Sequence, residues 1–149
     1  EVTKRGNKKK MLTPMTFSLS HATDFADRIE HLLVRRVMEA ISLANKAGEL
    51  VTGFTKVEAL LGSGDALALL HGADAAMDGR QKLDRKYAAV AHDRGKRAVV
   101  LDSLAIGELS LAIGRENVVH AALKEGGAAR RAVTESERLV CYRSGGRIP

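Results

Sequence analysis

The stretch that decides the fold is Ala112-Ile113-Gly114-Arg115-Glu116-Asn117-Val118-Val119-His120-Ala121-Ala122, which predicts a helix end, a polar loop and then a buried strand. Its counterpart is Ala47-Gly48-Glu49-Leu50-Val51-Thr52-Gly53-Phe54-Thr55-Lys56, which predicts a helix end, a short strand, a glycine turn and a new helix. In a chain that alternates helices and strands, both turns could meet at one edge of one sheet. Two adjacent loops that carry Lys56 and Arg115 suit a ligand that presents several phosphate groups, which favours RNA.

The size and composition indicate one globular domain with a basic surface. The chain has 149 residues, of which 45% are apolar and 28% are charged, and this balance is typical of folded proteins rather than disordered ones. The net charge of +6 is concentrated at the two ends, at residues 1–10 and 124–149, while the body is nearly neutral. Basic ends indicate either a polyanionic partner or a solvated tail, and we favour the partner.

The cysteine content and the hydropathy pattern bear on the compartment. Cys141 is the single cysteine of the sequence, so an internal disulfide is excluded and a reducing compartment is expected. No apolar run approaches the roughly 20 residues that span a bilayer, and no signal-peptide pattern opens the chain. We therefore expect a cytoplasmic protein with no membrane partner. The first residue is Glu1, on a basic stretch, which is compatible with a part of a longer protein.

The N-terminal region divides into a tail and a long helix. Residues 1–19 lack a sustained period and read as a basic tail or linker, and residues 20–149 read as the folded domain. From Thr23 the apolar residues recur at steps of three and four, which predicts a helix of about six turns. Thr23 would cap this helix, and Asp24 and Asp27 would lie at its positive end. Its expected buried face consists of Phe25, Ile29, Leu32, Leu33, Val37, Ala40, Ile41 and Ala44.

The remaining chain alternates between short apolar runs and amphipathic stretches. We expect strands at residues 50–51, 66–70, 98–101 and 118–122, and helices beginning at Thr55 and at Ser103. A further helix carries Leu83, Tyr87, Val90 and Ala91 on one face and the basic residues from Arg80 to Lys86 on the other, and a closing helix carries Ala129, Ala132, Val133, Leu139 and Val140. Thr55 and Glu58 have the spacing of a capping box. This order predicts an α/β fold, a three-layer α/β/α sandwich with a small mixed sheet of about four strands.

The order and spacing of several short motifs carry a family resemblance. They are Ala44-Asn45-Lys46-Ala47-Gly48, Val51-Thr52-Gly53, Gly64, Ala73-Asp74-Ala75-Ala76, Ser103, Gly107-Glu108-Leu109 and Ala112-Ile113-Gly114. Over residues 29–123 the chain resembles the kink-turn-binding ribosomal-protein superfamily of the L-seven-Ae and L-thirty-e type, in particular its bacterial YlxQ-like branch. The preceding tail is similar to the stretch that follows a YlxR-type domain in fused bacterial proteins, which implies a second nucleic-acid-binding module upstream.

The resemblance implies which residues hold RNA. In this superfamily the contacts come from the glycine turn and from the loop before the last strand. It therefore implies roles for Gly53, Phe54, Thr55, Lys56, Ile113, Gly114, Arg115, Glu116 and Asn117. The tail could add phosphate contacts, or could simply be solvated, at Lys8, Lys9 and Lys10.

The glycine turn departs from the family pattern at the residues that read bases. Kink-turn binders carry Asn-Glu after this glycine and a Lys three residues further on, whereas this chain has Thr55, Lys56 and then Ala59. Neither Thr nor Lys supplies the carboxylate that accepts hydrogen bonds from guanine. A helix start with exposed amides and a nearby cation remains, which predicts contact with structured RNA but not kink-turn specificity.

Each of these candidate sites also has an interpretation that involves no RNA contact. The turn from Gly53 to Glu58 could be an ordinary capped turn, and the loop with Arg115 and Asn117 a solvated one. A solvated helix face is the favoured interpretation of the basic cluster Arg80, Lys82, Arg85 and Lys86. A protein-interaction module on the same fold is the alternative to an RNA-binding domain.

Enzyme and metal sites have little support in the sequence. His71, Asp74 and Asp78 lack the spacing of metal ligands, and Asp74 is expected to cap a turn. His120 is expected to be a satisfied core residue, because it lies within an apolar strand. With aromatic residues at only 3%, base stacking on a sheet is disfavoured. We expect no catalytic residues, no metal and no cofactor.

Overall fold

The structure is a computed structural model that describes residues 19–146. Residues 1–18 of the predicted basic tail, with Lys8, Lys9 and Lys10, lie outside the described residues. Helices and strands alternate as predicted, in the order α1 (Leu19–Lys46), β2 (Leu50–Thr52), α2 (Phe54–Ser63), β3 (Ala66–His71), α3 (Met77–Asp93), β4 (Val100–Leu101), α4 (Ile106–Ile113), β5 (His120–Lys124) and α5 (Gly127–Arg143).

The four strands form one mixed sheet in the order β2-β5-β3-β4. The central strand β5 runs antiparallel to both of its neighbours, with Thr52 opposite Ala121 and His71 opposite His120. The short edge strand β4 pairs in parallel with β3. This pairing confirms the predicted mixed sheet of about four strands.

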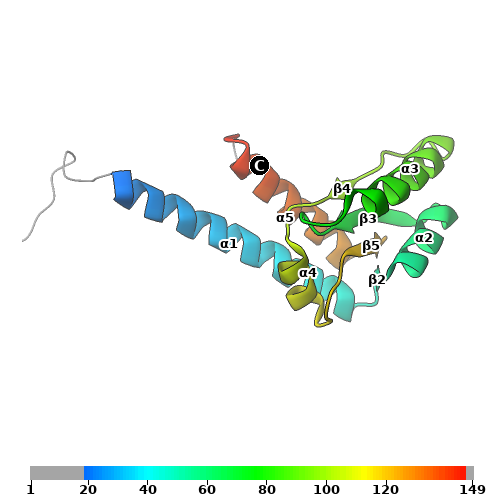
Figure 1. The fold of residues 1–149 in the computed structure, drawn as a ribbon, viewed down its shortest axis with the longest axis horizontal. Helices are drawn as coiled ribbons and strands as arrows, with labels where there is room; N and C mark the ends of the chain where they lie inside the picture. Colours follow the sequence, from blue (N-terminus) through cyan, green and yellow to red (C-terminus); the bar gives the residue numbers. More distant parts are fainter. Residues whose placement is uncertain (1–18, 147–149) are drawn as a thin grey trace, which may run out of the picture. The chain divides into compact units, whose positions relative to one another are not determined.

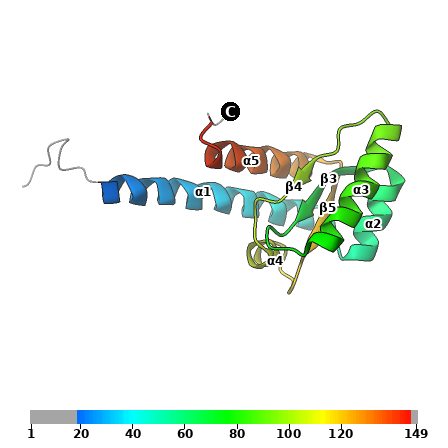
Figure 2. The same ribbon diagram turned by 45° about the horizontal axis from the view of Figure 1, so that its top comes forward.

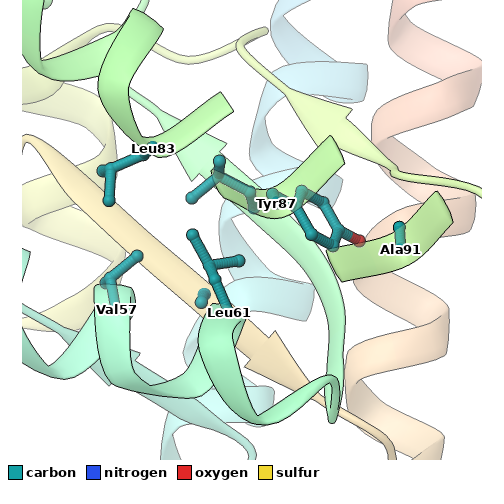
Figure 3. Close-up of a cluster of buried hydrophobic side chains, with 7 residues drawn as sticks. Val57, Leu61, Leu83, Tyr87 and Ala91 are labelled. Carbon is teal, nitrogen blue, oxygen red and sulfur yellow. The ribbon is translucent and has the colours of Figure 1, made fainter. Parts of the chain in front are cut away.

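Helices cover both faces of the sheet, which confirms the predicted three layers. Figures 1 and 2 show α2 and α3 on one face and α5 on the other. Between α2, α3 and the sheet lies the buried cluster of Figure 3, made by Val57, Leu61, Leu69, Leu83, Tyr87, Ala91 and Ala122. The Tyr87 hydroxyl donates to the Leu67 carbonyl and accepts from the Val99 N–H, so it ties α3 to the sheet. Burial raises the pKa of Tyr87 and keeps this hydroxyl protonated.

Helix α1 differs from its prediction at its N-terminal end. The described chain divides into two compact units within α1, after Leu32. In the second unit the predicted face is buried, at Leu33, Val37, Ala40, Ile41 and Ala44. In the first unit Phe25 and Leu32 are 62% and 60% exposed, so the predicted core is wrong there. The helical period identifies an apolar face but does not tell whether another element covers it.

The two predicted helix caps Thr23 and Thr55 are also wrong. Helix α1 already begins at Leu19, so Thr23 lies inside it, and Asp24 and Asp27 fall beyond its first turn. Helix α2 begins at Phe54 after Gly53, so Thr55 is a helical residue and cannot be the cap of a capping box. Within the described residues no side chain caps α2. Gly53 takes the cap position because its backbone conformation, at φ 91° and ψ 140°, is one that other residues rarely adopt.

Two other helices receive their caps from distant loops. The N–H of Ile106, at the start of α4, donates to Asp74 Oδ1 over 2.8 Å, and the N–H of Ala129, in the first turn of α5, donates to Glu49 Oε1 over 2.8 Å. Asp74 therefore caps a helix rather than its own turn, and α4 begins at Ile106 rather than at Ser103. Such carboxylates satisfy the exposed amides and complement the positive end of the helix dipole.

The strand limits shift by one or two residues. The predicted strand at 118–122 is β5 at 120–124, because the Val118 N–H donates to Ser110 Oγ and holds Val118 in the loop. The predicted strand at 98–101 is reduced to the two residues of β4, although the Val99 carbonyl still accepts from the Leu69 N–H over 2.8 Å.

Candidate functional site

Antiparallel pairing brings the two predicted turns to the same end of the sheet. Thr52, the last residue of β2, lies opposite Ala121, the second residue of β5, so the chain leaving β2 meets the chain entering β5. Between them lies a hollow of about 410 Å³, hereafter the turn hollow. Its lining consists of Thr52, Gly53, Phe54, Arg115, Glu116, Asn117, Val118, Val119 and His120.

The turn hollow contains five of the nine RNA-contact residues that the resemblance implies: Gly53, Phe54, Arg115, Glu116 and Asn117. Thr55 and Lys56 are exposed on the first turn of α2 but do not line the hollow. Ile113 is buried, and its carbonyl accepts a hydrogen bond from Asn45 Nδ2 over 3.1 Å. Gly114 ends α4 in the left-handed conformation and is exposed. Whether these residues contact RNA stays a prediction.

The Gly53 side of the turn hollow is dominated by backbone groups. The first amides of a helix have no acceptor within the helix, and in the described chain no side chain caps those of α2. The N–H of Val57 is the first to bond inside the helix, to the Gly53 carbonyl. The α2 N-terminus therefore presents N–H donors and the positive end of the helix dipole beside the hollow.

The opposite side is a loop held by several hydrogen bonds. The Ser110 carbonyl accepts from the N–H groups of Gly114 and Arg115, and the Ser110 hydroxyl accepts from the Val118 N–H. Asn117 has φ 53°, a left-handed conformation that asparagine tolerates better than most residues. The loop thus has a defined shape while Arg115, Glu116 and Asn117 stay exposed.

Rings and a cation form the wall between the turn hollow and α3. The Phe54 ring lies edge-on to the His120 ring, with 6.1 Å between their centroids. Lys82 Nζ lies 5.5 Å from the Phe54 centroid, within the range of a cation–π contact. The α3 helix therefore supplies positive charge to the same end of the sheet.

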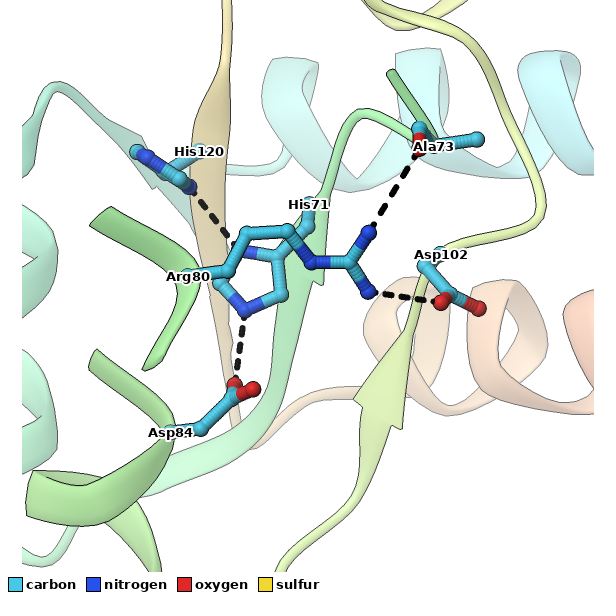
Figure 4. A network of polar contacts seen from close by, with 6 residues as sticks. All are labelled: His71, Ala73, Arg80, Asp84, Asp102 and His120. Carbon is cyan, nitrogen blue, oxygen red and sulfur yellow. Dashed lines mark hydrogen bonds and ion pairs between the residues drawn. The ribbon is translucent and has the colours of Figure 1, made fainter. Parts of the chain in front are cut away.

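A chain of hydrogen bonds runs from His120 into the protein (Figure 4). His120 Nδ1 lies 2.8 Å from His71 Nδ1, and His71 Nε2 lies 2.7 Å from Asp84 Oδ1. The His71 side chain is fully buried, whereas His120 is half-buried. Burial lowers the pKa of His120, and the nearby His71 and Arg80 lower it further, against an opposing effect of Asp84. His120 is therefore satisfied at one nitrogen, as expected, but it also lines the hollow and is not a core residue.

Sequence reasoning missed the link between His71, Asp84 and His120. His71 and His120 come from two paired strands, 49 positions apart, and Asp84 lies on α3. A polar residue inside each of two apolar strands was the available signal, because buried polar groups need partners. The pairing of β3 with β5 was needed to match them.

The basic cluster on α3 is only partly a solvated face. Lys82, Arg85 and Lys86 are exposed, but Arg80 donates to Asp102 Oδ2 over 2.7 Å and reaches the Ala73 carbonyl at 3.5 Å (Figure 4). Arg80 therefore fastens α3 to the loop after β4.

Residues 19–146 bring together no set of three or more His, Cys, Asp or Glu side chains placed to bind a metal. His71 pairs with Asp84 rather than with Asp74 or Asp78. Over the same range, none of the helices combines the length and the apolar character needed to cross a bilayer.

Comparison with known proteins gives similarity in structure only. No protein-family model matches the chain, and no curated protein sequence matches it. A solved structure of a protein with unknown function from Bacillus halodurans has 22% identity and a TM-score of 0.56, over 68% of this chain and 97% of that one. The 15.5 kD RNA-binding protein of Giardia lamblia has 16% identity and a TM-score of 0.51, over 75% of this chain and 88% of that one. At these identities the similarity shows a common fold.

Proposed function

We propose that this chain is a non-enzymatic RNA-binding domain that holds a bent or internally looped RNA at the turn hollow. The observation that carries the proposal is the meeting of two rigid turns, one with the uncapped amides of α2 and the other with Arg115, around a single hollow. The RNA-binding protein of Giardia lamblia, which has the same fold, supports a general RNA-binding role.

Phosphate contacts would supply most of the affinity at this site. The N–H groups at a helix start and a nearby guanidinium are established ligands for phosphate oxygens. Lys56, on the first turn of α2, and Lys82, beside Phe54, extend the positive charge on either side. Since such contacts read shape rather than sequence, they suit an RNA whose backbone is already bent.

Base reading at the glycine turn would be weak. Thr55 and Lys56 offer no carboxylate to a guanine edge, and Ala59 offers no cation. Stacking would also be limited, because Phe54 and His120 are the rings that line the hollow. A kink-turn would therefore be held through its bent backbone more than through its bases.

The salt dependence of binding tests the proposal. The full chain is titrated with a kink-turn RNA, an internal-loop RNA and a matched duplex at several salt concentrations. Contact with about four phosphates should give log K a slope of roughly −3 to −4 against log salt, with the bent RNAs bound more tightly than the duplex. Micromolar or weaker binding to all three RNAs with no salt slope would contradict an RNA-binding function.

The alternative function is a protein-interaction module, and one observation favours it. Several large apolar side chains are exposed, namely Phe25, Leu32, Leu43, Met77, Val100, Leu111 and Val140. Crosslinking of the full-length protein in cells, followed by identification of the attached RNA and protein, separates the two functions. Recovery of protein partners without RNA would support the alternative.

A further inference from the structure

When both rings are neutral, the hydrogen bonds behind the turn hollow assign the protons of the two histidines to particular nitrogens. A carboxylate only accepts hydrogen bonds, so His71 must donate to Asp84 from Nε2. A neutral His71 then has an unprotonated Nδ1, which accepts from Nδ1–H of His120. A neutral His120 protonated at Nδ1 has an unprotonated Nε2. In this neutral state the hydrogen bonds from His120 to His71 and from His71 to Asp84 leave His120 Nε2 as a hydrogen-bond acceptor.

Within residues 19–146 no group donates a hydrogen bond to His120 Nε2. His120 Nδ1, by contrast, is hydrogen-bonded to His71 Nδ1. His120 lines the turn hollow and is only half-buried, so Nε2 is not enclosed in the core. An acceptor nitrogen at the wall of a hollow is satisfied by water or by a donor group of a ligand.

Gly79, at the start of α3, lies next to this nitrogen. A β-carbon at Gly79 would lie 3.0 Å from His120 Nε2, closer than ordinary van der Waals contact. Gly79 lies in the first turn of α3, and no unusual backbone conformation requires a glycine there. Glycine is a poor helix former, and a side chain at this position would press on His120 Nε2 and reduce the space around it.

The charged groups around His120 favour its neutral state. Arg80 and Asp84 face it from α3, His71 faces it from β3, and Lys82 lies behind the Phe54 ring. Burial, His71 and Arg80 together lower the pKa of His120 despite Asp84. Near neutral pH the ring is therefore an acceptor at Nε2 rather than a cation with two donors.

We propose that His120 Nε2 recognises RNA by accepting a hydrogen bond from an amino or hydroxyl group of a nucleotide seated in the turn hollow, with His71 and Asp84 as positioning residues. The inference rests on the proposed function and adds a base-reading or sugar-reading atom to a surface that otherwise contacts phosphates. It places the selectivity on the β5 side of the hollow, opposite the turn that lacks the guanine-reading carboxylate.

The first test needs no RNA. Nitrogen-15 NMR distinguishes a protonated from an unprotonated imidazole nitrogen. In the full chain at pH 7.5 we expect His120 to be protonated at Nδ1 and unprotonated at Nε2, and Asp84→Asn to weaken this preference. Protonation of His120 at Nε2 in the unaltered chain would overturn the proposal.

The second test removes access to the nitrogen and uses a matched glycine as control. Gly79→Ala should lower affinity for the bent RNA about tenfold, the loss of one well-placed hydrogen bond. Gly107→Ala, also within a helix but with nothing within 4 Å of its added β-carbon, should leave affinity unchanged. Equal affinities of the two variants would contradict the proposal. If Gly79→Ala misfolds, as judged by circular dichroism, His120→Phe provides the same comparison.

The third test alters the RNA and leaves the protein intact. Inosine in place of guanosine and purine riboside in place of adenosine remove amino groups, and 2′-deoxy substitutions remove hydroxyls. One of these changes within the loop should cost about tenfold in the unaltered chain and much less in Gly79→Ala, because coupled groups are not additive. The sensitive substitution tells whether the donor is a base amino group or a ribose hydroxyl.

These outcomes separate the two proposals. If the unaltered chain binds bent RNA with the expected salt slope but every RNA substitution costs less than twofold, only the role of His120 is wrong. If the unaltered chain binds no RNA, the proposed function fails and the role of His120 fails with it.

Discussion

A hollow lies at each end of helix α2, and the difference between the two hollows shows what makes one of them a candidate site. Its N-terminus borders the turn hollow, and its C-terminal end borders a second hollow of about 680 Å³, hereafter the rear hollow. The rear hollow is the larger one, and three basic residues line it, against one in the turn hollow. Its lining consists of Leu60, Asp65, Ala66, Leu67, Lys96, Arg97, Val99, Lys124 and Glu125.

Two of the three basic residues that line the rear hollow, Lys96 and Arg97, have partners within the protein, as does the neighbouring Arg94. Lys96 Nζ donates to the Gly64 carbonyl over 3.3 Å, and Arg94 donates to the Ser63 carbonyl over 2.8 Å. Arg97 lies 3.6 Å from Glu137. The carbonyls at a helix end attract cations, so Lys96 and Arg94 complete α2 rather than await a ligand. The turn hollow is therefore distinguished by the unsatisfied amides of α2 and not by its number of basic residues.

Charge reversal should give the largest difference in RNA affinity between the two hollows. Lys56→Glu with Arg115→Glu should lower affinity for bent RNA roughly 30- to 100-fold, about 2–3 kcal/mol, and should flatten the salt slope by about two. Arg97→Glu with Lys124→Glu makes the same change in net charge at the rear hollow and should cost less than about threefold, because it removes only diffuse attraction. Fluorescence anisotropy titrations measure both, and equal losses would mean that net charge alone governs binding.

Two glycines test the backbone of the same two regions. Gly53→Ala should lower the free energy of unfolding by about 2–3 kcal/mol, because φ 91° with ψ 140° is nearly restricted to glycine. Gly95→Ala, beside Lys96, should cost only about 1 kcal/mol, because φ 66° falls within the left-handed range that alanine can enter. Neither added β-carbon meets another atom within 4 Å, so urea denaturation compares backbone strain alone. Similar losses would show that the Gly53 turn is not specially constrained.

The double variant Thr55→Asn with Lys56→Glu should increase the preference of the turn hollow for a kink-turn. Both side chains are exposed, and Glu is favoured in the first turn of a helix, so stability should barely change. The preference for a kink-turn over a duplex should rise toward the low end of about 1–3 kcal/mol, because Ala59 stands where kink-turn binders carry a lysine. A variant that folds normally but gains no preference would show that the glycine turn does not face RNA.

The smallest expected effect is a pH dependence of stability that comes from His120. Its pKa in the folded chain lies below its ordinary value of about 6.5, so the unfolded chain binds more protons under acidic conditions. Stability should therefore hold above about pH 6.5 and fall as the pH drops below it. Denaturation from pH 8 to 5 should show a shallower fall for His120→Phe than for the unaltered chain. Identical pH profiles for His120→Phe and the unaltered chain would show that His120 does not cause the pH dependence.

Periodicity and end signals were sufficient for the architecture of this chain. The apolar runs at Ala66–Leu70 and around Ala121 predict buried strands because both faces of the sheet are covered. Gly48, Gly64 and Gly114 mark helix ends because each adopts a positive φ. The antiparallel pairing around β5 then brings the two predicted turns together.

The main errors concern the partners of polar groups and the burial of an apolar face. The expected caps Thr23 and Thr55 were sought next to their helices, whereas Asp74 caps α4 and Glu49 caps α5 from distant loops. A periodic apolar face also could not reveal that Phe25 remains exposed. Local pattern fixes the type of an element, and the partners of its polar groups depend on the assembled sheet.

The cap on α5 has a consequence for the order in which the chain assembles. The Glu49 carboxylate reaches an amide 80 positions later, and the Glu49 carbonyl also accepts from the N–H of Lys124, at the end of β5. A β-carbon at Gly126 would overlap this carboxylate, so the last turn of chain before α5 must pass close to it. Contacts between such distant residues form slowly, since a long loop must close first. The cap on the first turn of α5 therefore requires the start of β2 and the end of β5 to be side by side, so the pairing that forms the turn hollow at one end also completes α5 at the other.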